Sequence, residues 1–264
     1  LYSQYTIFKQ MLIHDMTPKD FGDMYAQTIT YGMFTARLHD NSLDTFSRQE
    51  AAELLPNTNP FLQKLFRHIA GYDLDTRISW AVDSLVKIFR ATDVKKLLSN
   101  FGTKTQRNDP IIHFYEEFLA EFDPKLRKSR GVWYTPEPVV KFIVRAVDEV
   151  LINEFDLPKG LADSSKTTIK VDTDQRDARS KTGFKQIDKE IHKVQVLDPA
   201  TGTGTFLAET IKFIHEKKQY FKWSNYVEND LLPRIHGFEI VMASYAMAHL
   251  KLDLLLNETG YEAT

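Results

Sequence analysis

Apolar residues in the first part of the chain recur at steps of three and four, the spacing of one face of an α-helix. One such stripe follows Thr17-Pro18-Lys19-Asp20, where Thr17 is suited to cap a helix and Pro18 to its first turn. Its apolar positions are Phe21, Met24, Tyr25, Ile29, Met33, Phe34 and Leu38. A second stripe over 78–89 contains Trp80, Val82, Leu85, Val86 and Phe89. The pattern therefore predicts one helix from residue 18 and another near residue 78.

Three further sites combine a capping residue with proline. Asn59-Pro60 and Asp109-Pro110 each precede apolar residues at helical spacing, so both are predicted helix starts. Thr135-Pro136-Glu137-Pro138 is the third. For the helix that follows it, we expect a buried face made of Val139, Val140, Ile143, Val144, Val147, Val150 and Leu151.

The pattern changes after residue 158. Residues 159–193 carry more charged than apolar side chains, which predicts an exposed insertion, either a solvated hairpin around 167–171 or a partly disordered segment. Beyond it, 194–198 reads as a short strand, a glycine turn follows, and 206–214 continues at helical spacing. Residues 235–240 read as a second strand and 241–256 as a second helix. This order predicts a parallel α/β sheet.

A basic segment over 124–131, with proline at its start and glycine at its end, reads as a hinge. We therefore expect a mostly α domain over 1–128 and an α/β domain over 129–264, with 159–193 as an insertion in the second. A length of 264 residues fits one large or two small domains. The chain begins with Leu1 rather than Met, which we take to indicate a piece of something longer.

Composition and charge exclude several classes of protein. The formal charge is −2, whereas a compact nucleic-acid-binding domain is expected to be clearly basic, so any DNA contact must be local or lie outside the chain. The absence of cysteine excludes disulfides, thiolate zinc sites and thiol catalysis, and it fits a reducing, cytoplasmic compartment. No apolar run approaches the roughly 20 residues of a membrane helix. The eight histidines show no metal-binding spacing, so we expect no metal.

The stretch from Asp198 to Phe206 carries the clearest chemistry: a carboxylate ends a strand, and Gly202 and Gly204 open the next helix. Glycines let the backbone turn tightly and approach a ligand closely. No Gly-Lys-Ser/Thr follows, which argues against a phosphate-binding loop. Leu207 stands where a dinucleotide fingerprint needs a third small residue. The remaining class binds a nucleoside without phosphates.

Three stretches resemble the S-adenosylmethionine-dependent amino-methyltransferases of DNA. Residues 198–206, Asp-Pro-Ala-Thr-Gly-Thr-Gly-Thr-Phe, look like motif I of that family. Residues 131–136, Gly-Val-Trp-Tyr-Thr-Pro, look like motif X, and 237–240, Gly-Phe-Glu-Ile, look like motif II. The order X, I, II is that of the gamma group, which mostly methylates N6 of adenine. The helical region, including the stretch from Asp20 to Phe34, resembles the helical spacer of large single-chain restriction–modification enzymes.

The resemblance implies the start of a Rossmann-like sheet and a set of cofactor-binding residues. Asp198 would lie near the methionine end of the cofactor, and Glu239 would accept hydrogen bonds from its ribose hydroxyls. Gly202 and Gly204 would give the backbone its close approach. The full implied set is Tyr134, Thr135, Pro136, Asp198, Pro199, Ala200, Gly202, Gly204, Phe206 and Glu239. Glu239 follows Asp198 at more than the roughly 20 residues of dinucleotide folds, so an extended helix is expected between 217 and 233.

The family's catalytic motif, Asn/Asp/Ser-Pro-Pro-aromatic, is absent, because no Pro-Pro occurs in the sequence. We therefore expect a fragment of an adenine-N6 DNA methyltransferase that is inactive alone. Its partners would be double-stranded DNA and the other domains of a parent chain, with nuclease and motor regions elsewhere. Helix 241–256 would lose its packing partners and expose Met242, Tyr245, Leu250 and Leu254, which predicts self-association or a disordered end unless the 159–193 hairpin covers a sheet edge.

Two other functions remain open from the sequence. The chain could be a non-catalytic coupling or assembly module that links nuclease and methyltransferase parts through its helices. It could also belong to a methyltransferase of protein or RNA, which would share the glycine loop. Binding of S-adenosylmethionine separates the coupling module from the methyltransferase readings.

Overall fold

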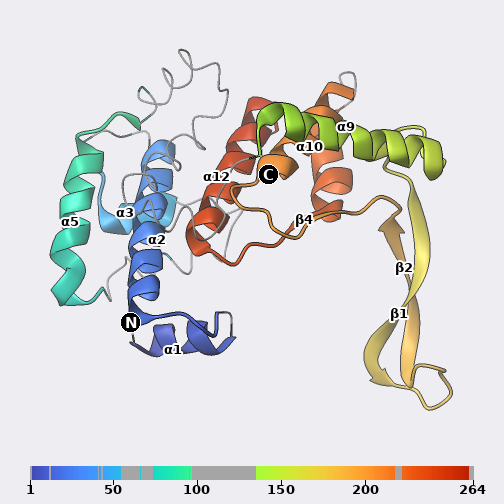
Figure 1. Cartoon of the computed structure of the whole chain (residues 1–264), viewed down its shortest axis with the longest axis horizontal. Coiled ribbons are helices and arrows are strands. Elements are labelled where there is room, and N and C mark those ends of the chain that lie inside the picture. Colours follow the sequence, from blue (N-terminus) through green and yellow to red (C-terminus); the bar gives the residue numbers. More distant parts are fainter. Residues whose placement is uncertain are drawn as a thin grey trace.

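The computed structural model describes residues 2–11, 13–40, 42, 44–54, 66, 74–94, 96, 135–217 and 222–261. In this part of the chain the fold is mostly helical, with two small sheets (Figure 1). The first half contains α1 (Tyr2–Met11), α2 (Pro18–His39), α3 (Arg48–Leu54) and α5 (Thr76–Arg90). The helix starts predicted at 60 and 110 and the hinge over 124–131 lie outside the described residues.

Helix α2 begins where the sequence predicts. The Thr17 hydroxyl accepts a hydrogen bond from the Asp20 amide, and the Asp20 carboxylate accepts one from the Thr17 amide. This reciprocal capping box satisfies two backbone donors that a helix start otherwise leaves unpaired. The predicted helix over 78–89 is likewise confirmed as α5, which Asp75 caps.

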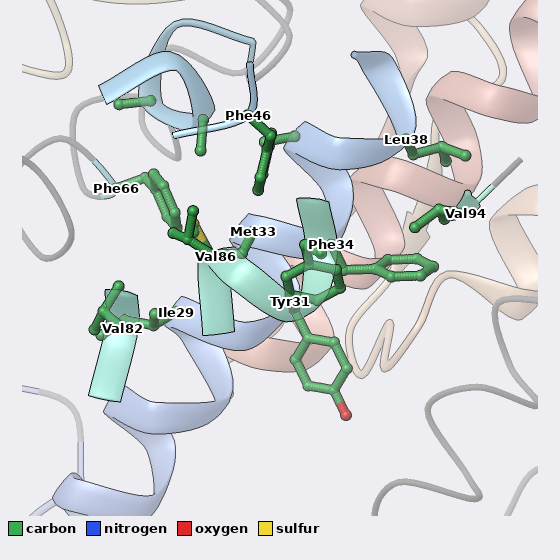
Figure 2. Close-up of a cluster of buried hydrophobic side chains, with 14 of the residues drawn as sticks. Ile29, Tyr31, Met33, Phe34, Leu38, Phe46, Phe66, Val82, Val86 and Val94 are labelled. Atoms are coloured by element: carbon green, nitrogen blue, oxygen red, sulfur yellow. The ribbon is translucent and has the colours of Figure 1, made fainter. Parts of the chain in front are cut away.

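The largest apolar core lies between α2, α3 and α5 (Figure 2). Tyr31, Met33 and Phe34 of α2 and Phe46 before α3 are almost fully buried, and Val82 and Val86 of α5 pack in the same cluster. Ala243, Met247 and Leu250 of α12 (Met242–Glu258) belong to this cluster as well. The core therefore joins residues from both sides of the predicted boundary at 128/129, and the division into two domains stays a prediction.

Helix α12 corrects the expectation of an exposed C-terminal helix. Met242 and Leu250 are buried, and Tyr245 and Leu254 are partly buried against neighbouring clusters. The reason is that α12 packs against α2 on one side and against α10 (Thr205–Lys217) on another. The N-terminal helices thus supply the partner that sequence reasoning placed outside the chain.

Helix α9 (Glu137–Glu154) starts where predicted, but its expected buried face is only half right. Val140 and Val144 are buried, whereas Val139, Ile143, Val147 and Val150 are exposed. The buried face continues instead through Asp148, which pairs with Lys217 of α10 and accepts the Leu161 amide at 2.8 Å. Apolar residues occupy two faces of this helix, and periodicity alone cannot tell which one packs.

The insertion after α9 contains the short turn η1 (Gly160–Ala162) and a hairpin of β1 (Lys166–Arg176) and β2 (Phe184–His192). The strands pair antiparallel, from Lys166 opposite His192 to Arg176 opposite Phe184, with an irregularity between Asp172 and Arg176. This confirms a hairpin. It extends away from the helices rather than over a sheet edge (Figure 1).

The second sheet consists of β3 (Val196–Asp198) and β4 (Ile235–Gly237), which pair in parallel. Between α10 and β4, the described chain forms the short helical turns α11 (Trp223–Tyr226), η2 (Val227–Leu231) and η3 (Leu232–Arg234). The expectation of one extended helix here is wrong. Lys222, directly before α11, has non-helical φ −32° and ψ 81°, so α11 starts as a separate turn.

Candidate functional site

The ends of β3 and β4 bring the glycine loop and the Gly-Phe-Glu stretch together. Asp198 pairs with Gly237 at the carboxyl ends of the two parallel strands. Beyond them the Phe238 amide donates to the Asp198 carbonyl at 2.9 Å, and the Thr201 amide donates to the Phe238 carbonyl at 3.0 Å. The loop after β3 is therefore hydrogen-bonded to the segment after β4.

Gly237 is required by this close approach. A Cβ at this position would collide with the Thr201 side chain. The Thr201 hydroxyl donates to the Asp198 carbonyl at 3.0 Å, which fixes the side chain over the strand end. Sequence reasoning identified the motif around Gly237 but missed the role of Thr201. The only signal was a threonine between the strand and the two glycines.

The two glycines of the loop serve different purposes. Gly202 has φ +55°, and a Cβ built on it would meet no atom within 4 Å, so only the backbone conformation requires glycine. Gly204 has φ +80°, and its Cβ would lie 3.3 Å from the Cβ of Ala248 on α12. Gly204 thus lets α12 pack directly on the loop, whereas Gly202 leaves an open approach to the backbone.

Glu239 is the side chain that joins the two segments. Its Oε2 accepts the Gly202 amide at 2.8 Å, and its Oε1 accepts the Val241 amide at 2.7 Å, immediately before α12. Hydrogen bonds to a charged acceptor contribute roughly 1.5–3 kcal/mol each. The predicted motif I and motif II residues therefore touch one another, and Glu239 fixes the loop and the helix start at once.

Two polar side-chain atoms beside the loop are buried without a hydrogen-bond partner among the described residues: Asp198 Oδ2 and Thr203 Oγ1. The other Asp198 oxygen accepts the Ala200 amide at 3.1 Å. A buried acceptor left unpaired costs free energy, so a partner that donates to Asp198 Oδ2 would be stabilised there.

The remaining predicted residues flank this arrangement. Pro199 and Ala200 are exposed, and Phe206 is partly buried against the cluster around α10. Lys251, a buried residue of α12 that sequence reasoning missed, donates to the Thr205 hydroxyl at 3.3 Å. Gly204, Ala248 and Lys251 together hold α12 against the start of α10.

Thr135 and Pro136 directly precede α9, and Tyr134 lies outside the described residues. Charged side chains of α9 and α10 lie close to one another. Burial raises the pKa of Glu209 near the start of α10, opposed by the positive charge of Lys141 near the start of α9. Further along, Asp148 of α9 pairs with Lys217 of α10. The ion pair holds α9 against α10. That the Thr135-Pro136 turn and the glycine loop face one crevice stays a prediction.

A large cavity lies elsewhere, between α1, α2 and α5. Its volume is about 720 Å³, and its lining is mainly aromatic and aliphatic, including Tyr5, Phe21, Tyr25 and Leu85. Within the described ranges, no group of three or more potential metal ligands occurs. The same residues contain no helix long and apolar enough to cross a membrane.

The chain is similar to proteins of restriction–modification systems. Residues 106–160 match a family model described as N-6 DNA Methylase; this match ends before the glycine loop. A putative type II restriction enzyme and methyltransferase from Methanocaldococcus jannaschii is 24% identical over 164 residues, or 57% of this chain and 14% of that protein.

The chain also resembles two solved structures. The cryoEM structure of a DrdV–DNA complex matches 98% of this chain and 21% of that chain, with 22% identity and a TM-score of 0.60. A nuclease-deletion mutant of the Type ISP restriction–modification enzyme LlaGI, in complex with a DNA substrate mimic, matches at 20% identity and a TM-score of 0.48. The chain spans 14% of the M. jannaschii relative and 21% of DrdV.

Proposed function

We propose that the chain is the cofactor-binding part of an S-adenosylmethionine-dependent adenine-N6 DNA methyltransferase of a restriction–modification system. The proposal starts from the similarity of residues 106–160 to N-6 DNA methylases and of the chain to a putative restriction enzyme and methyltransferase. The observation that carries the proposal is the hydrogen bond from the Gly202 amide, after β3, to Glu239, after β4. Ligands of open α/β sheets bind at such strand ends. The pair β3–β4 with α10 and α12 would be the beginning of a Rossmann-like sheet.

In this proposal the loop residues contact different parts of the cofactor. Asp198 holds the methionine end, Glu239 accepts the ribose hydroxyls, and the backbone at Gly202 lies against the ligand. Phe206 and Gly204 support the loop from the side of α10 and α12. Pro199 and Ala200 line the loop's outer edge, and Tyr134, Thr135 and Pro136 close over the methionine part.

The residues present fit S-adenosylmethionine in charge and hydrogen bonding. The unpartnered Asp198 Oδ2 suits an ammonium donor. Each Glu239 oxygen accepts one amide and retains capacity for a hydroxyl donor. When bound, the cofactor supplies an electrophilic methyl group on its sulfonium. The residues of this chain orient the cofactor and keep its backbone contacts fixed.

The whole enzyme would act on double-stranded DNA and would flip the target adenine out of the duplex. The names of the similar proteins, a restriction enzyme and methyltransferase and a DNA complex, support that assignment. The catalytic Pro-Pro-aromatic motif would come from outside these 264 residues, because no Pro-Pro occurs among them.

A second candidate is a non-catalytic coupling module. The observation that favours it is the core that α12 shares with α2 and α5, since a helix packed into both halves would transmit movement between them. In that case the glycine loop would be structural, and the chain would not bind cofactor.

Titration calorimetry with S-adenosylmethionine separates the two candidates. The wild-type chain is expected to bind saturably, and Gly202→Asp is expected to abolish binding by setting a second carboxylate beside Glu239. Gly183→Asp is the matched control, because Gly183 also has positive φ, +79°, with no atom within 4 Å of a Cβ, and lies at the hairpin tip. A folded wild-type chain that binds no cofactor would contradict the methyltransferase proposal and favour the coupling module.

A further inference from the structure

The hairpin of β1 and β2 forms an arm that extends from the body of the molecule (Figure 1). At roughly 3.3 Å per residue, the 11 residues of β1 span about 35 Å, close to one turn of B-DNA. The arm is fixed at its base. His192 is buried and contacts the Asp230 carboxylate at 3.0 Å, and the Lys193 amide donates to the Ser165 carbonyl at 2.9 Å.

The tip of the arm concentrates positive charge. Between residues 176 and 185 the sequence carries Arg176, Arg179, Lys181 and Lys185 against a single acid, Asp177. The four cations are exposed. The chain as a whole is slightly acidic, with a formal charge of −2, so this tip is a local exception.

Two of the nearby carboxylates, Asp177 and Asp172, are engaged with neutral donors, and a third, Asp174, is exposed. Asp177 accepts the Arg179 amide at 2.9 Å. Asp172 accepts the Thr182 hydroxyl at 2.7 Å and the Gln186 side-chain amide at 2.9 Å. Among the described residues, none of the four tip cations forms an ion pair. Lys166, at the base of the arm, lies 3.5 Å from Glu190. The tip charges are therefore available to an anionic partner.

The turn that presents these cations has a defined backbone. The Asp177 amide donates to the Gly183 carbonyl at 3.0 Å, and the Gly183 amide donates to the Ser180 carbonyl at 3.1 Å. Gly183 supplies the positive φ of +79° that the turn requires. Preorganised cations lose less conformational freedom on binding than cations on an unordered loop.

We infer that the β1–β2 arm is a DNA-contacting element whose tip cations bind backbone phosphates. The inference rests on the proposed function, which supplies DNA as the partner. A two-stranded ribbon has the dimensions to enter the major groove, and unpaired arginines and lysines at its end match phosphate charge. The contact is local, which reconciles DNA binding with an acidic chain. Because phosphate contacts carry no sequence information, the arm contributes affinity and register rather than specificity.

Fluorescence anisotropy with a labelled 30-base-pair duplex in a KCl series tests this inference. The tip variant carries Arg176→Gln, Arg179→Gln, Lys181→Gln and Lys185→Gln. The matched control removes four exposed lysines from other elements: Lys19→Gln, Lys87→Gln, Lys159→Gln and Lys222→Gln. Both variants lose the same charge, and all substituted residues are exposed, so both are expected to fold as the wild type does, which circular dichroism checks.

The tip variant is expected to bind DNA more weakly, with the slope of log K against log [KCl] reduced by about 0.9 for each phosphate that the arm no longer neutralises. Removing the neutralisation of two or more phosphates makes the slope shallower by roughly 1.8 or more, while the control keeps the wild-type slope. Equal slopes for the tip variant and the control would overturn the inference. So would a wild-type chain that binds poly-glutamate as well as it binds DNA, which would mean a protein partner.

A parallel measurement of cofactor binding distinguishes a failure of the arm inference from a failure of the proposed function. The tip variant is expected to bind S-adenosylmethionine as the wild type does, because the tip lies at the far end of the arm. A wild-type chain that binds cofactor but not DNA at low salt would overturn the arm inference alone. A wild-type chain that binds DNA through the tip but not cofactor would support the arm and contradict the proposed function.

Discussion

The glycine loop after β3 and the tip of the β1–β2 arm are both turns built around glycines with positive φ. Gly202 and Gly204 have φ +55° and +80°, and Gly183 has φ +79°. Their surroundings differ. The loop is held by β4, Glu239 and α12, whereas exposed cations surround the tip. The local backbone is similar in the two places, and neighbouring side chains decide what each turn can bind.

The two regions also place charge in different ways. At the loop, the carboxylates of Asp198 and Glu239 accept backbone amides at the strand ends, which suits a ligand with hydroxyl and ammonium donors. At the tip, four cations face solvent, and within the described ranges none of them forms an ion pair. The chain thus separates a proposed cofactor site from a proposed DNA contact, and each can be altered without the other.

The largest expected effect comes from adding a methyl group to each turn. Gly204→Ala forces an L-residue to positive φ, which costs about 1–2 kcal/mol, and it crowds Ala248 at 3.3 Å, which adds roughly 1–3 kcal/mol. Gly183→Ala carries the backbone cost alone. Urea denaturation measures both variants. If the free energy of unfolding falls equally in the two variants, the packing of α12 on the loop is not what requires Gly204.

A smaller effect is expected from neutralising an acid in each region. Glu239→Gln replaces one acceptor oxygen with a donor that faces an amide, so the free energy of unfolding should fall by about 1.5–3 kcal/mol. The matched change in the arm is Glu190→Gln. The Glu190 carboxylate lies 3.5 Å from the exposed ammonium group of Lys166. Such surface pairs contribute at most about 1 kcal/mol. Equal destabilisation of the two variants in thermal or urea unfolding would mean that Glu239 does not fasten the loop.

The smallest effect concerns pH. Burial lowers the pKa of His249, which lies on α12 beside Tyr245 at a ring separation of 4.5 Å. In the unfolded chain this histidine takes up a proton below about pH 6.5, whereas the folded chain resists protonation to lower pH. Stability from this group is therefore complete above about pH 6.5 and is lost as pH falls, by at most about 1.4 kcal/mol per pH unit.

His249→Gln should flatten the stability profile between pH 7 and pH 5, measured by urea midpoints at each pH. His14→Gln is the control, because His14 is exposed. An unchanged slope in His249→Gln would show that the acid sensitivity of α12 has another origin.

Local signals in the sequence predicted local structure. Thr17, Pro18 and Asp20 specify the start of α2 because a capping box involves only four consecutive positions. The parallel order of β3 and β4 and the helix after each followed from short strands and glycines. The buried face of α9 was half wrong because apolar residues lie on two of its faces, and the choice depends on α10.

Contacts between distant segments could not be predicted in the same way. The sequence placed α12 at risk of exposure, although its apolar residues surround the helix, a pattern typical of burial between two layers. The resemblance indicated Gly202 and Glu239 as parts of one site, but not their direct hydrogen bond. Thr201, Ala248 and Lys251 were missed because their roles exist only once the loop packs on β4 and α12.

Hydrogen–deuterium exchange with and without S-adenosylhomocysteine, the demethylated cofactor, tests the proposed cofactor site most directly. We predict slower amide exchange in the segments 196–206 and 235–242 when the ligand is present, and no change at the arm tip over 176–185. The Gly202 amide, already bonded to Glu239, should gain further protection. Saturating ligand that leaves both segments unchanged, or that protects only the cavity between α2 and α5, would contradict the assignment of this site.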